Sequence, residues 1–223
     1  MRYAFLFVLV AIILIALAAF FMLQPPPMAA TQQTGGTAIS VSTSTITDET
    51  SVYSIHADYP VFGIPALDAK IKQTIDTGIA DIKSTDANPS PNNIQNEFES
   101  TFDDVYIGDD IVSVKLLLSQ YTGGAHNNSI AIGINYDRAT GTFLTLDQAL
   151  SLTGKTLSEV SELAKSSLTS DFESVQFPEG AAPTPDNYST FVINKNSVTF
   201  IFQEYQVEAY AAGQPEVSIP RIK

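Results

Sequence analysis

The stretch "IVSVKLLLSQYTGGAHNNSIAIGINYD" (residues 111–137) contains two runs of alternating side chains that flank a glycine-containing segment. Because alternate side chains of a strand point the same way, each run has one apolar face. In the first run this face consists of Val112, Val114, Leu116 and Leu118. In the second it consists of Ile130, Ile132, Ile134 and Tyr136, opposite a face of Ser129, Ala131, Gly133 and Asn135. The sequence predicts an antiparallel hairpin, 111–121 paired with 129–136, with one buried face and a positive-φ turn at Gly123 and Gly124.

The chain before this hairpin shows both strand and helix periodicity. "SVYSIHADYP" (51–60) alternates and ends at a proline, and "EFESTFDDVYI" (97–107) has a second strand pattern. Between them, "ALDAKIKQTIDTGIADIK" (66–83) spaces its large apolar residues three or four positions apart, as one stripe of a helix does. The members of that stripe are Leu67, Ile71, Ile75, Ile79 and Ile82.

The C-terminal third repeats this alternation of helix and strand patterns. "TLSEVSELAKSSL" (156–168) begins with a capping box formed by Thr156 and Glu159, and it predicts a helix. "FVINKNSVTFIF" (191–202) predicts a second hairpin, and "PEVSIP" (215–220) predicts an edge strand bounded by prolines. The expected buried stripe of the helix is Leu157, Val160, Leu163, Ala164 and Leu168. We therefore expect an α+β fold with antiparallel sheets and inserted helices.

The N-terminus predicts a single transmembrane helix before this fold. From Ala4 to Leu23 the chain has no charged or polar side chain, and a helix of that length, at ~1.5 Å per residue, spans a hydrocarbon core of ~30 Å. Arg2 lies on the short side, which places residues 1–3 in the cytoplasm and the remainder outside the membrane. A cleaved signal peptide is the alternative, but its apolar region is normally shorter, and Met28 stands where a cleavage site prefers a small residue.

The segment after the apolar helix divides the chain into parts. Residues 24–50 are rich in Pro, Thr and Ser, so we expect a linker, although "ISVSTST" (39–45) also alternates like an edge strand. The folded unit is expected to start near Ser51. It would contain a smaller module over 51–110 and a larger module over 111–223.

The charge and the residue types exclude several classes of protein. The 24 acidic and 11 basic residues give a formal charge of −13, which becomes −14 when Arg2 is left out. Such a surface repels the phosphate backbone of nucleic acids and attracts a basic partner. The chain has no cysteine, which rules out disulfides and thiolate chemistry.

No assembled catalytic motif is apparent. "LTGKT" (152–156) lacks the first glycine of a phosphate-binding loop, where Ala149 stands, and no G-x-S-x-G elbow occurs. His56 falls within a strand pattern and is interpreted as a structural histidine. The pairs Asp103–Asp104 and Asp109–Asp110 lack an EF-hand-like spacing and are interpreted as solvated turn residues. We expect no catalytic residue, no metal site and no cofactor.

Two strings in the C-terminal half carry a family resemblance. "YTGGAHNN" (121–128), followed by "INYD" and "TGTFLTLDQAL", and then "FIFQEYQVEAYAAGQPEVSIP" (200–220), resembles the extracytoplasmic domain shared by RsiV-type anti-sigma factors and PdaC-type peptidoglycan deacetylases, a domain of unknown function. "YSIHADYPVFG" (53–63) through "FDDVYIG" (102–108) resembles the smaller module that precedes it. The resemblance implies an α+β external domain and, in RsiV-type members, binding to lysozyme.

The resemblance also suggests which outputs to expect. An anti-sigma factor needs a cytoplasmic domain, whereas about three residues precede the apolar segment here, and a PdaC-type enzyme needs a following catalytic domain, whereas this sequence stops at Lys223. We therefore expect a membrane-anchored, non-catalytic module that faces the cell wall and binds a wall glycan or peptide, or a basic wall-active protein such as a lysozyme.

The expected binding residues lie in the two family strings. Tyrosines offer flat apolar faces with a hydroxyl edge, suited to sugars or to a protein partner, although they can instead be packed to hold the loops. Two other functions stay open: a structural partner of other envelope proteins, and a wall hydrolase that uses His126 with Asp137 or Asp147. The expected binding residues are Tyr121, Gly123, Gly124, His126, Tyr205 and Tyr210.

Overall fold

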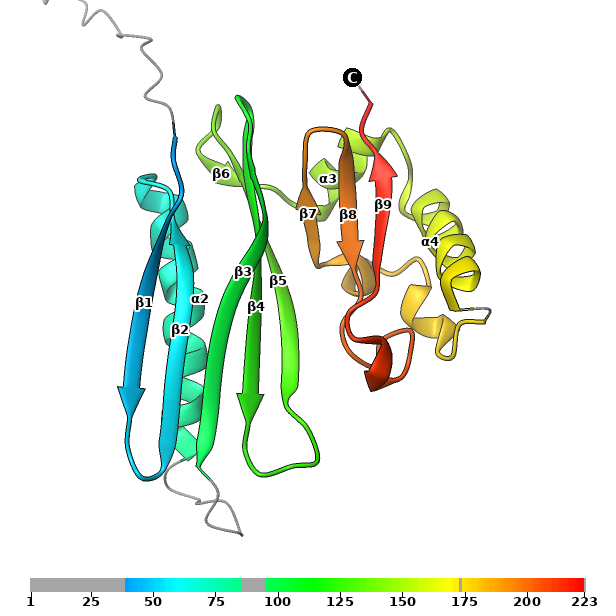
Figure 1. Cartoon of the computed structure of the whole chain (residues 1–223). Coiled ribbons are helices and arrows are strands. Elements are labelled where there is room, and N and C mark those ends of the chain that lie inside the picture. The colour runs from blue at the N-terminus through cyan, green and yellow to red at the C-terminus, as the bar shows by residue number, and fades with distance from the viewer. Residues whose placement is uncertain (1–38, 86–94, 173, 223) are drawn as a thin grey trace, which may run out of the picture. The chain divides into compact units, whose positions relative to one another are not determined.

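The computed structural model describes residues 39–85, 95–172 and 174–222, which form two antiparallel-rich sheets and the helices that cover them (Figure 1). The first sheet, sheet A, has the strand order β1-β2-β3-β4-β5-β6, and the second, sheet B, has the order β7-β8-β9. Sheet A consists of β1 (Ser42–Glu49), β2 (Tyr53–Val61), β3 (Asn96–Ile107), β4 (Ile111–Tyr121), β5 (Asn128–Asp137) and β6 (Thr142–Phe143), with helix α2 (Pro65–Ser84) between β2 and β3. Sheet B consists of β7 (Phe191–Ile193), β8 (Ser197–Ile201) and β9 (Glu216–Pro220), preceded by α3 (Leu146–Thr153) and α4 (Leu157–Phe172). The α+β class expected from the sequence is confirmed.

The N-terminal edge of sheet A corrects the expected start of the folded unit. β1 pairs with β2 from Ser42 opposite Val61 to Glu49 opposite Ser54, so the expected linker 24–50 contains a strand and the fold begins before Ser51. A strand at a sheet edge needs few apolar side chains, which explains why a Thr- and Ser-rich composition masked it. The predicted transmembrane segment, 4–23, lies outside the described residues. None of the helices that the structure describes is long and apolar enough to cross a membrane.

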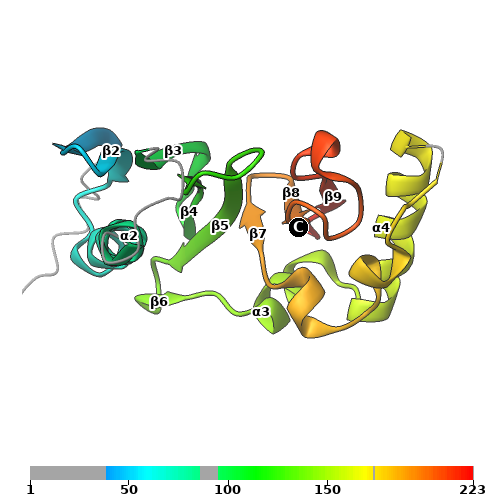
Figure 2. The ribbon, with the colours of Figure 1, turned by 90° about the horizontal axis from the view of Figure 1, so that it is seen from below.

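Helix α2 covers one face of sheet A (Figures 1 and 2). It connects β2 to β3, which run parallel, whereas every other strand pair in the described chain is antiparallel. The predicted stripe is confirmed: Leu67, Ile71, Ile75 and Ile82 are almost completely buried, and Ile79 packs beside them. Gly78 lies against the Phe98 ring, where an added Cβ would have no room, so this helical glycine allows close contact with the sheet. The sheet contributes Val112, Val114, Leu116 and Leu118 to the same core.

Sheet B covers part of the other face of sheet A, so the prediction of a single buried face is wrong. The antiparallel pairing of β4 with β5 is confirmed, with Val114 opposite Ile134. However, Ser113 is completely buried and Asn135 nearly so, although both lie on the face that the sequence assigned to solvent. Ile130, assigned to the buried face, is 42% exposed. The small and polar residues on this face of the hairpin form an interface with sheet B rather than a solvent-exposed surface.

The contact between the two sheets depends on one glycine and a buried polar network. An added Cβ on Gly133 would lie 1.8 Å from the carbonyl oxygen of Phe191, so the β5 and β7 backbones touch. Ser113 Oγ donates to Asn135 Oδ1 at 2.7 Å and accepts from the Ile193 backbone N–H at 2.9 Å. Asn135 Nδ2 donates to the Phe191 carbonyl oxygen at 2.8 Å. Each buried polar group of this network therefore has a partner, which avoids the cost of leaving it unpaired.

A buried lysine makes a second connection between the sheets. Lys115 on β4 has a side chain only 9% exposed, and its Nζ lies 3.1 Å from Asp103, 2.8 Å from Asp104 and 2.6 Å from Glu216 on β9. Burial lowers the pKa of this ammonium group, but the hydrogen bonds that it donates to the three carboxylates outweigh that effect and raise the pKa above its ordinary value. Asp104 takes a positive φ of 50° at a register shift in β3, which brings both aspartates to Lys115.

The two acidic pairs thus have different roles. Asp103–Asp104 does not form a solvated turn, which corrects the expectation from the sequence, because the bulge in β3 directs both carboxylates at Lys115. Asp109–Asp110 does lie in the turn between β3 and β4, as predicted, and Asp110 Oδ2 pairs with Arg221 at 3.0 Å.

The second core lies between sheet B and helices α3 and α4. The Thr156–Glu159 capping box of α4 is confirmed, with Thr156 N–H donating to Glu159 Oε2 at 2.8 Å. Leu163, predicted to be buried, is 43% exposed, because it lies on the outer side of the stripe formed by its neighbours. Helix α3 was not predicted, although Thr145 and Gln148 form a capping box there as well. The hairpin β7–β8 and the edge position of β9 are confirmed.

Replacing Gly133 by Ala should destabilise the chain by at least ~2 kcal/mol, because the new methyl group would collide with backbone rather than with a movable side chain. Urea denaturation of the full chain measures this. Gly124→Ala is the matched control, since its Cβ would meet its nearest atom at 3.6 Å and should change stability by less than ~0.5 kcal/mol. Equal stability of the two variants would contradict the close contact of β5 and β7.

Replacing Lys115 by Met should cost about 2–4 kcal/mol, since three carboxylates would then meet without a cation. Lys72→Met, which removes an exposed pair with Asp76, should cost less than ~0.5 kcal/mol. Because the pKa of Lys115 is raised, its contribution is fully present below pH 10.5 and is lost only as pH rises through the raised pKa. A difference between wild type and Lys115→Met that disappears between pH 7 and pH 10, where the three carboxylates stay ionised, would contradict this assignment.

Candidate functional site: an aromatic and histidine cluster

The loop between β4 and β5 is shaped by its glycines and by Tyr121. Gly123 has a φ of +90°, as predicted, whereas Gly124 does not take a positive φ, so only the first glycine is required by the backbone. Tyr121 donates a hydrogen bond from its hydroxyl to the Gly124 carbonyl oxygen at 3.1 Å. This contact closes the loop at the end of β4.

The segment after β8 reaches the same region because its polar side chains complete the free edge of β5. Gln203 accepts from the Ala131 N–H and donates to the Ala131 carbonyl oxygen, both at 2.9 Å. Glu204 accepts from the Ser129 N–H at 3.2 Å. These side chains make the hydrogen bonds that a neighbouring strand would otherwise make. Gln206 secures the other side of the segment by donating to the carbonyl oxygens of Gly180 and Asn187.

His126 joins the two segments through two tyrosines. Its ring stacks on Tyr210, with ring centroids 3.8 Å apart and an angle of 24° between the planes. Its Nε2 lies 3.1 Å from the Tyr205 hydroxyl. We call Tyr121, His126, Tyr205 and Tyr210 the aromatic cluster. The structure thus brings together the residues that the sequence had placed in two separate strings, 121–126 and 205–210.

The hydrogen bonds of His126 define the form of its ring. The Asn127 carbonyl oxygen, 2.7 Å from Nδ1, can only accept, so Nδ1 carries the proton. In the neutral ring Nε2 therefore accepts from the Tyr205 hydroxyl. Both ring nitrogens are engaged, so His126 helps to hold the loop in place.

Tyr205 is the exposed and strained member of the aromatic cluster. It has a φ of +64°, a conformation that a bulky side chain rarely adopts, and it is 51% exposed. Strain of this kind costs on the order of 1–3 kcal/mol and persists only where the surroundings enforce it. Here the hydrogen-bonded side chains of the neighbouring residues Gln203, Glu204 and Gln206 enforce this backbone conformation. The result is a rigid tyrosine that projects into solvent.

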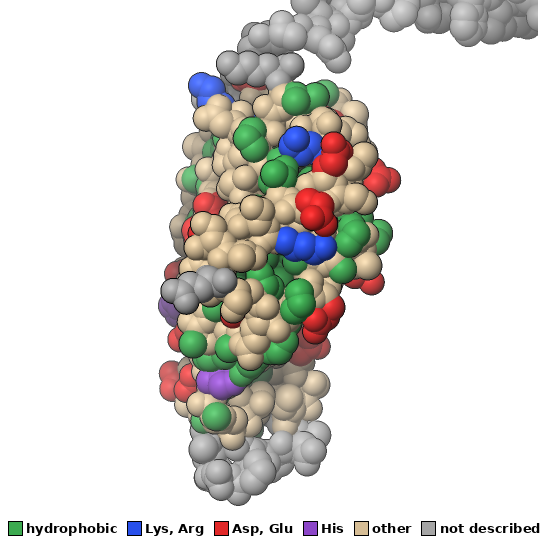
Figure 3. Space-filling view, turned by 90° about the vertical axis from the view of Figure 1, so that its right-hand side faces the viewer, with side chains coloured by type: hydrophobic (Ala, Val, Ile, Leu, Met, Phe, Trp, Pro, Cys, Tyr) green, Lys and Arg blue, Asp and Glu red, His purple; other side chains and the backbone are tan. Residues whose placement is uncertain are grey.

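The surroundings of the aromatic cluster are acidic. Two segments carry the cluster, 119–131 and 202–214, and the part of β3 that pairs beside it is 96–101. Together they contain Glu97, Glu99, Glu204 and Glu208 but no lysine or arginine. Glu97 lies directly opposite Tyr121 in the β3–β4 pairing. On the face drawn in Figure 3, acidic side chains are widely distributed and basic ones are sparse. The negative electrostatic potential of these side chains attracts a basic ligand and repels an anionic one.

The carboxylates considered as catalytic partners of His126 lie elsewhere. Asp137 ends β5 at the opposite end of the strand, where its Oδ1 accepts the N–H groups of Ala139 and Thr140, which lower its pKa from its ordinary value. Asp147 is in the first turn of α3. His56 is exposed on β2, with its Nε2 3.7 Å from Asp58. Within the described ranges, no group of three or more His, Asp or Glu residues is placed to hold a metal ion.

The fold and this site define a two-sheet α+β domain in which a segment after β8 braces the β4–β5 loop. A family described as a protein of unknown function (DUF3298) matches residues 150–221, and a family described as deacetylase PdaC matches residues 46–129. These two matches support a shared DUF3298/PdaC-type domain in this chain.

Individual relatives are distant. The peptidoglycan-N-acetylmuramic acid deacetylase PdaC of Bacillus subtilis is 23% identical over 188 residues, which cover 82% of this chain and 40% of that protein. This chain thus spans about two fifths of the length of that curated relative. A DUF3298 family structure from Bacteroides fragilis has a TM-score of 0.55 at 16% identity, and another from Pseudomonas aeruginosa has 0.50 at 16%. Each covers 82% of this chain and 90% of its own, and they support the fold alone.

Replacing Tyr205 by Gly separates a binding role from a packing role. Glycine adopts a positive φ without strain, so the gain should offset the lost contacts, and the free energy of unfolding should change by less than ~1 kcal/mol. Tyr188→Ala, which removes a completely buried tyrosine, should cost about 3–5 kcal/mol in the same denaturation experiment. A comparably large loss for Tyr205→Gly would show that this residue mainly holds the fold.

Proposed function

We propose that this chain is a non-catalytic, membrane-anchored binding module of the cell envelope that docks a ligand on the aromatic cluster. The favoured ligand is a basic wall-active protein such as a lysozyme, and a wall glycan or peptide is the alternative. The observation that carries the proposal is Tyr205: a strained, exposed tyrosine whose hydroxyl is hydrogen-bonded to His126 and whose ring lies beside the stacked pair of His126 and Tyr210. Rigid exposed tyrosines supply binding energy at a small entropic cost.

Electrostatics favour a basic protein among these ligands. The segments around the aromatic cluster carry four glutamates and no basic residue, and the whole chain has a formal charge of −13. Such a field accelerates encounter with a cationic partner and weakens as salt is added. A neutral glycan would gain little from it.

The names of the relatives support an envelope setting. PdaC of Bacillus subtilis is described as an enzyme that acts on peptidoglycan, and the matched part of it is about two fifths of its length. We propose that this shared part docks onto the wall or a wall-associated protein. The apolar segment 4–23 would then hold the module at the membrane, with the domain outside.

The test is retention of ligand by the detergent-solubilised full chain. At low salt we expect saturable binding to lysozyme in a pull-down or by calorimetry, and weaker binding as salt rises towards 0.5 M. Tyr205→Ala should weaken binding by about 10–30-fold, as the loss of a central tyrosine does at protein interfaces. Tyr106→Ala, which lies at the opposite end of β3 from Glu97 and Tyr121, is the matched control and should leave binding unchanged.

Two parallel measurements separate the alternatives. Co-sedimentation with purified peptidoglycan distinguishes a wall ligand from a protein ligand, and release of reducing ends or acetate detects catalysis. Turnover that His126→Ala abolishes would support a hydrolase. Retention of neither lysozyme nor peptidoglycan at low salt would contradict the proposal and favour an assembly role with other envelope proteins.

A further inference from the structure

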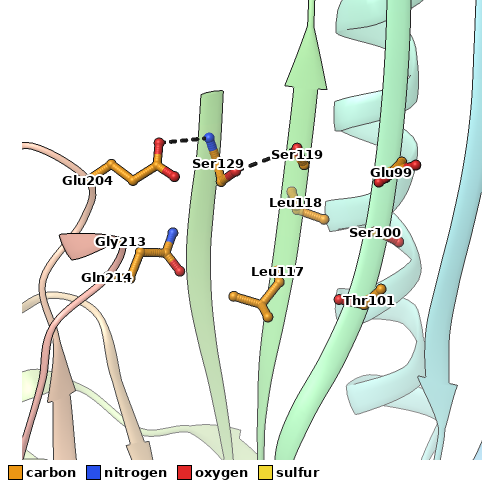
Figure 4. A pocket seen from close by; sticks show the side chains of 10 residues that line it. All are labelled: Glu99, Ser100, Thr101, Leu117, Leu118, Ser119, Ser129, Glu204, Gly213 and Gln214. Atoms are coloured by element: carbon orange, nitrogen blue, oxygen red, sulfur yellow. Dashed lines mark hydrogen bonds between the residues drawn. The ribbon is translucent and has the colours of Figure 1, made fainter. Parts of the chain in front are cut away.

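A pocket of about 290 Å³ lies beside the aromatic cluster, on the part of sheet A where the segment after β8 approaches (Figure 4). Its floor is formed by side chains that share one face of three strands: Glu99 is opposite Ser119, and Ser119 is opposite Ser129. Leu117 supplies an apolar area next to them. The wall is formed by Glu204, Gly213 and Gln214. The volume is at the lower end of the range for ligand pockets and suits one side chain.

One donor in the wall has no partner. Gln214 Nε2 is buried, and within the described chain it makes no hydrogen bond. The neighbouring amides of Gln203 and Gln206 are fully used, which makes Gln214 the exception in this segment. A buried donor without an acceptor is costly, so a turn of this amide toward the carbonyl oxygen of a ligand gains an interaction.

The charged groups define the rest of the ligand. Glu99 and Glu204 approach the pocket from opposite sides, and no lysine or arginine lines it. Glu204 uses Oε2 for the Ser129 N–H, and its other oxygen makes no hydrogen bond to the described chain. Two carboxylates above an apolar floor fit a cation on a methylene stem, because lysine and arginine bury their stems and keep their charged ends at polar groups.

We propose that this pocket receives a lysine or arginine side chain of the basic protein that docks on the aromatic cluster. The cation lies between Glu99 and Glu204, its stem crosses Leu117, and a backbone carbonyl of the partner accepts from Gln214 Nε2. This inference rests on the proposed function and specifies which chemical group of the partner the site recognises. The aromatic cluster supplies the apolar contact, and the pocket selects the charge.

The direct test is a titration of the ¹⁵N-labelled full chain, followed by NMR, with Nα-acetyl-lysine N-methylamide as the probe. The side-chain amide of Gln214 and the backbone amide of Ser129 should shift and saturate. Glu99→Gln should weaken binding about fivefold, the effect of losing one partly exposed ion pair of about 1 kcal/mol. Glu49→Gln removes the same charge from the end of β1 and should change binding less than twofold.

Three results would overturn the inference. The first is equal binding of the neutral Nε-acetylated probe, and the second is the absence of saturable shifts at Gln214 and Ser129. The third is binding of glucosamine without binding of the lysine or the corresponding arginine probe, which would assign the pocket to an amino sugar. If lysozyme binds and Tyr205→Ala weakens it while Glu99→Gln does not, the pocket assignment fails and the proposed function stands.

Discussion

The direct contact between the β5 and β7 backbones is the constraint on which the rest of the structure depends. It exists because Gly133 has no side chain and because Ser113 and Asn135 satisfy the polar groups that the contact buries. With β7 fixed against sheet A, the chain that follows β8 has to pass the free edge of β5. The two loops of the aromatic cluster meet for this reason, although 79 positions separate His126 from Tyr205 in the sequence.

The segment after β8 shows how a loop becomes a rigid site. Gln203 and Glu204 replace a strand at the β5 edge, and Gln206 ties the segment to the opposite loops. Between these fixed points the backbone has little freedom, and it holds Tyr205 at a positive φ. The polar residues of the string are therefore structural, and Tyr205 between them stays half exposed. This difference between the polar residues and the tyrosines explains why the short segment after β8 contains both glutamine and glutamate side chains and tyrosines.

Sequence patterns anticipated the elements whose determinants are local. The stripe of α2, the capping box of α4 and the two hairpins each depend on residues close in the chain, and periodicity or a cap motif identifies them. β1 was assigned to a linker because an edge strand tolerates a polar composition. Helix α3 had a usable signal in Thr145 and Gln148, which form the same kind of capping box that identified α4.

The second face of β4 and β5 was missed for a different reason. Gly133, Ser113 and Asn135 have the residue types of a solvent face, and only tertiary contact shows that they are buried against β7. The same reason applies to Asp103 and Asp104, whose partner Lys115 is brought near by a bulge. For the site, the family strings identified the tyrosines and His126. They did not single out Glu99 or Gln214. Glu99 lines the pocket because of the register of β3 with β4, and Gln214 lines it because the segment between β8 and β9 passes beside sheet A.

The proposed function requires a ligand to dock on the aromatic cluster. Hydrogen exchange of the full chain, with and without saturating lysozyme at low salt, tests it most directly because it locates the contact without altering a residue. We expect slower exchange in residues 121–128 and 203–213, with β1 and α2 unchanged. Bound lysozyme that protects β1 or α2 while both of those segments exchange as in the free chain would contradict it.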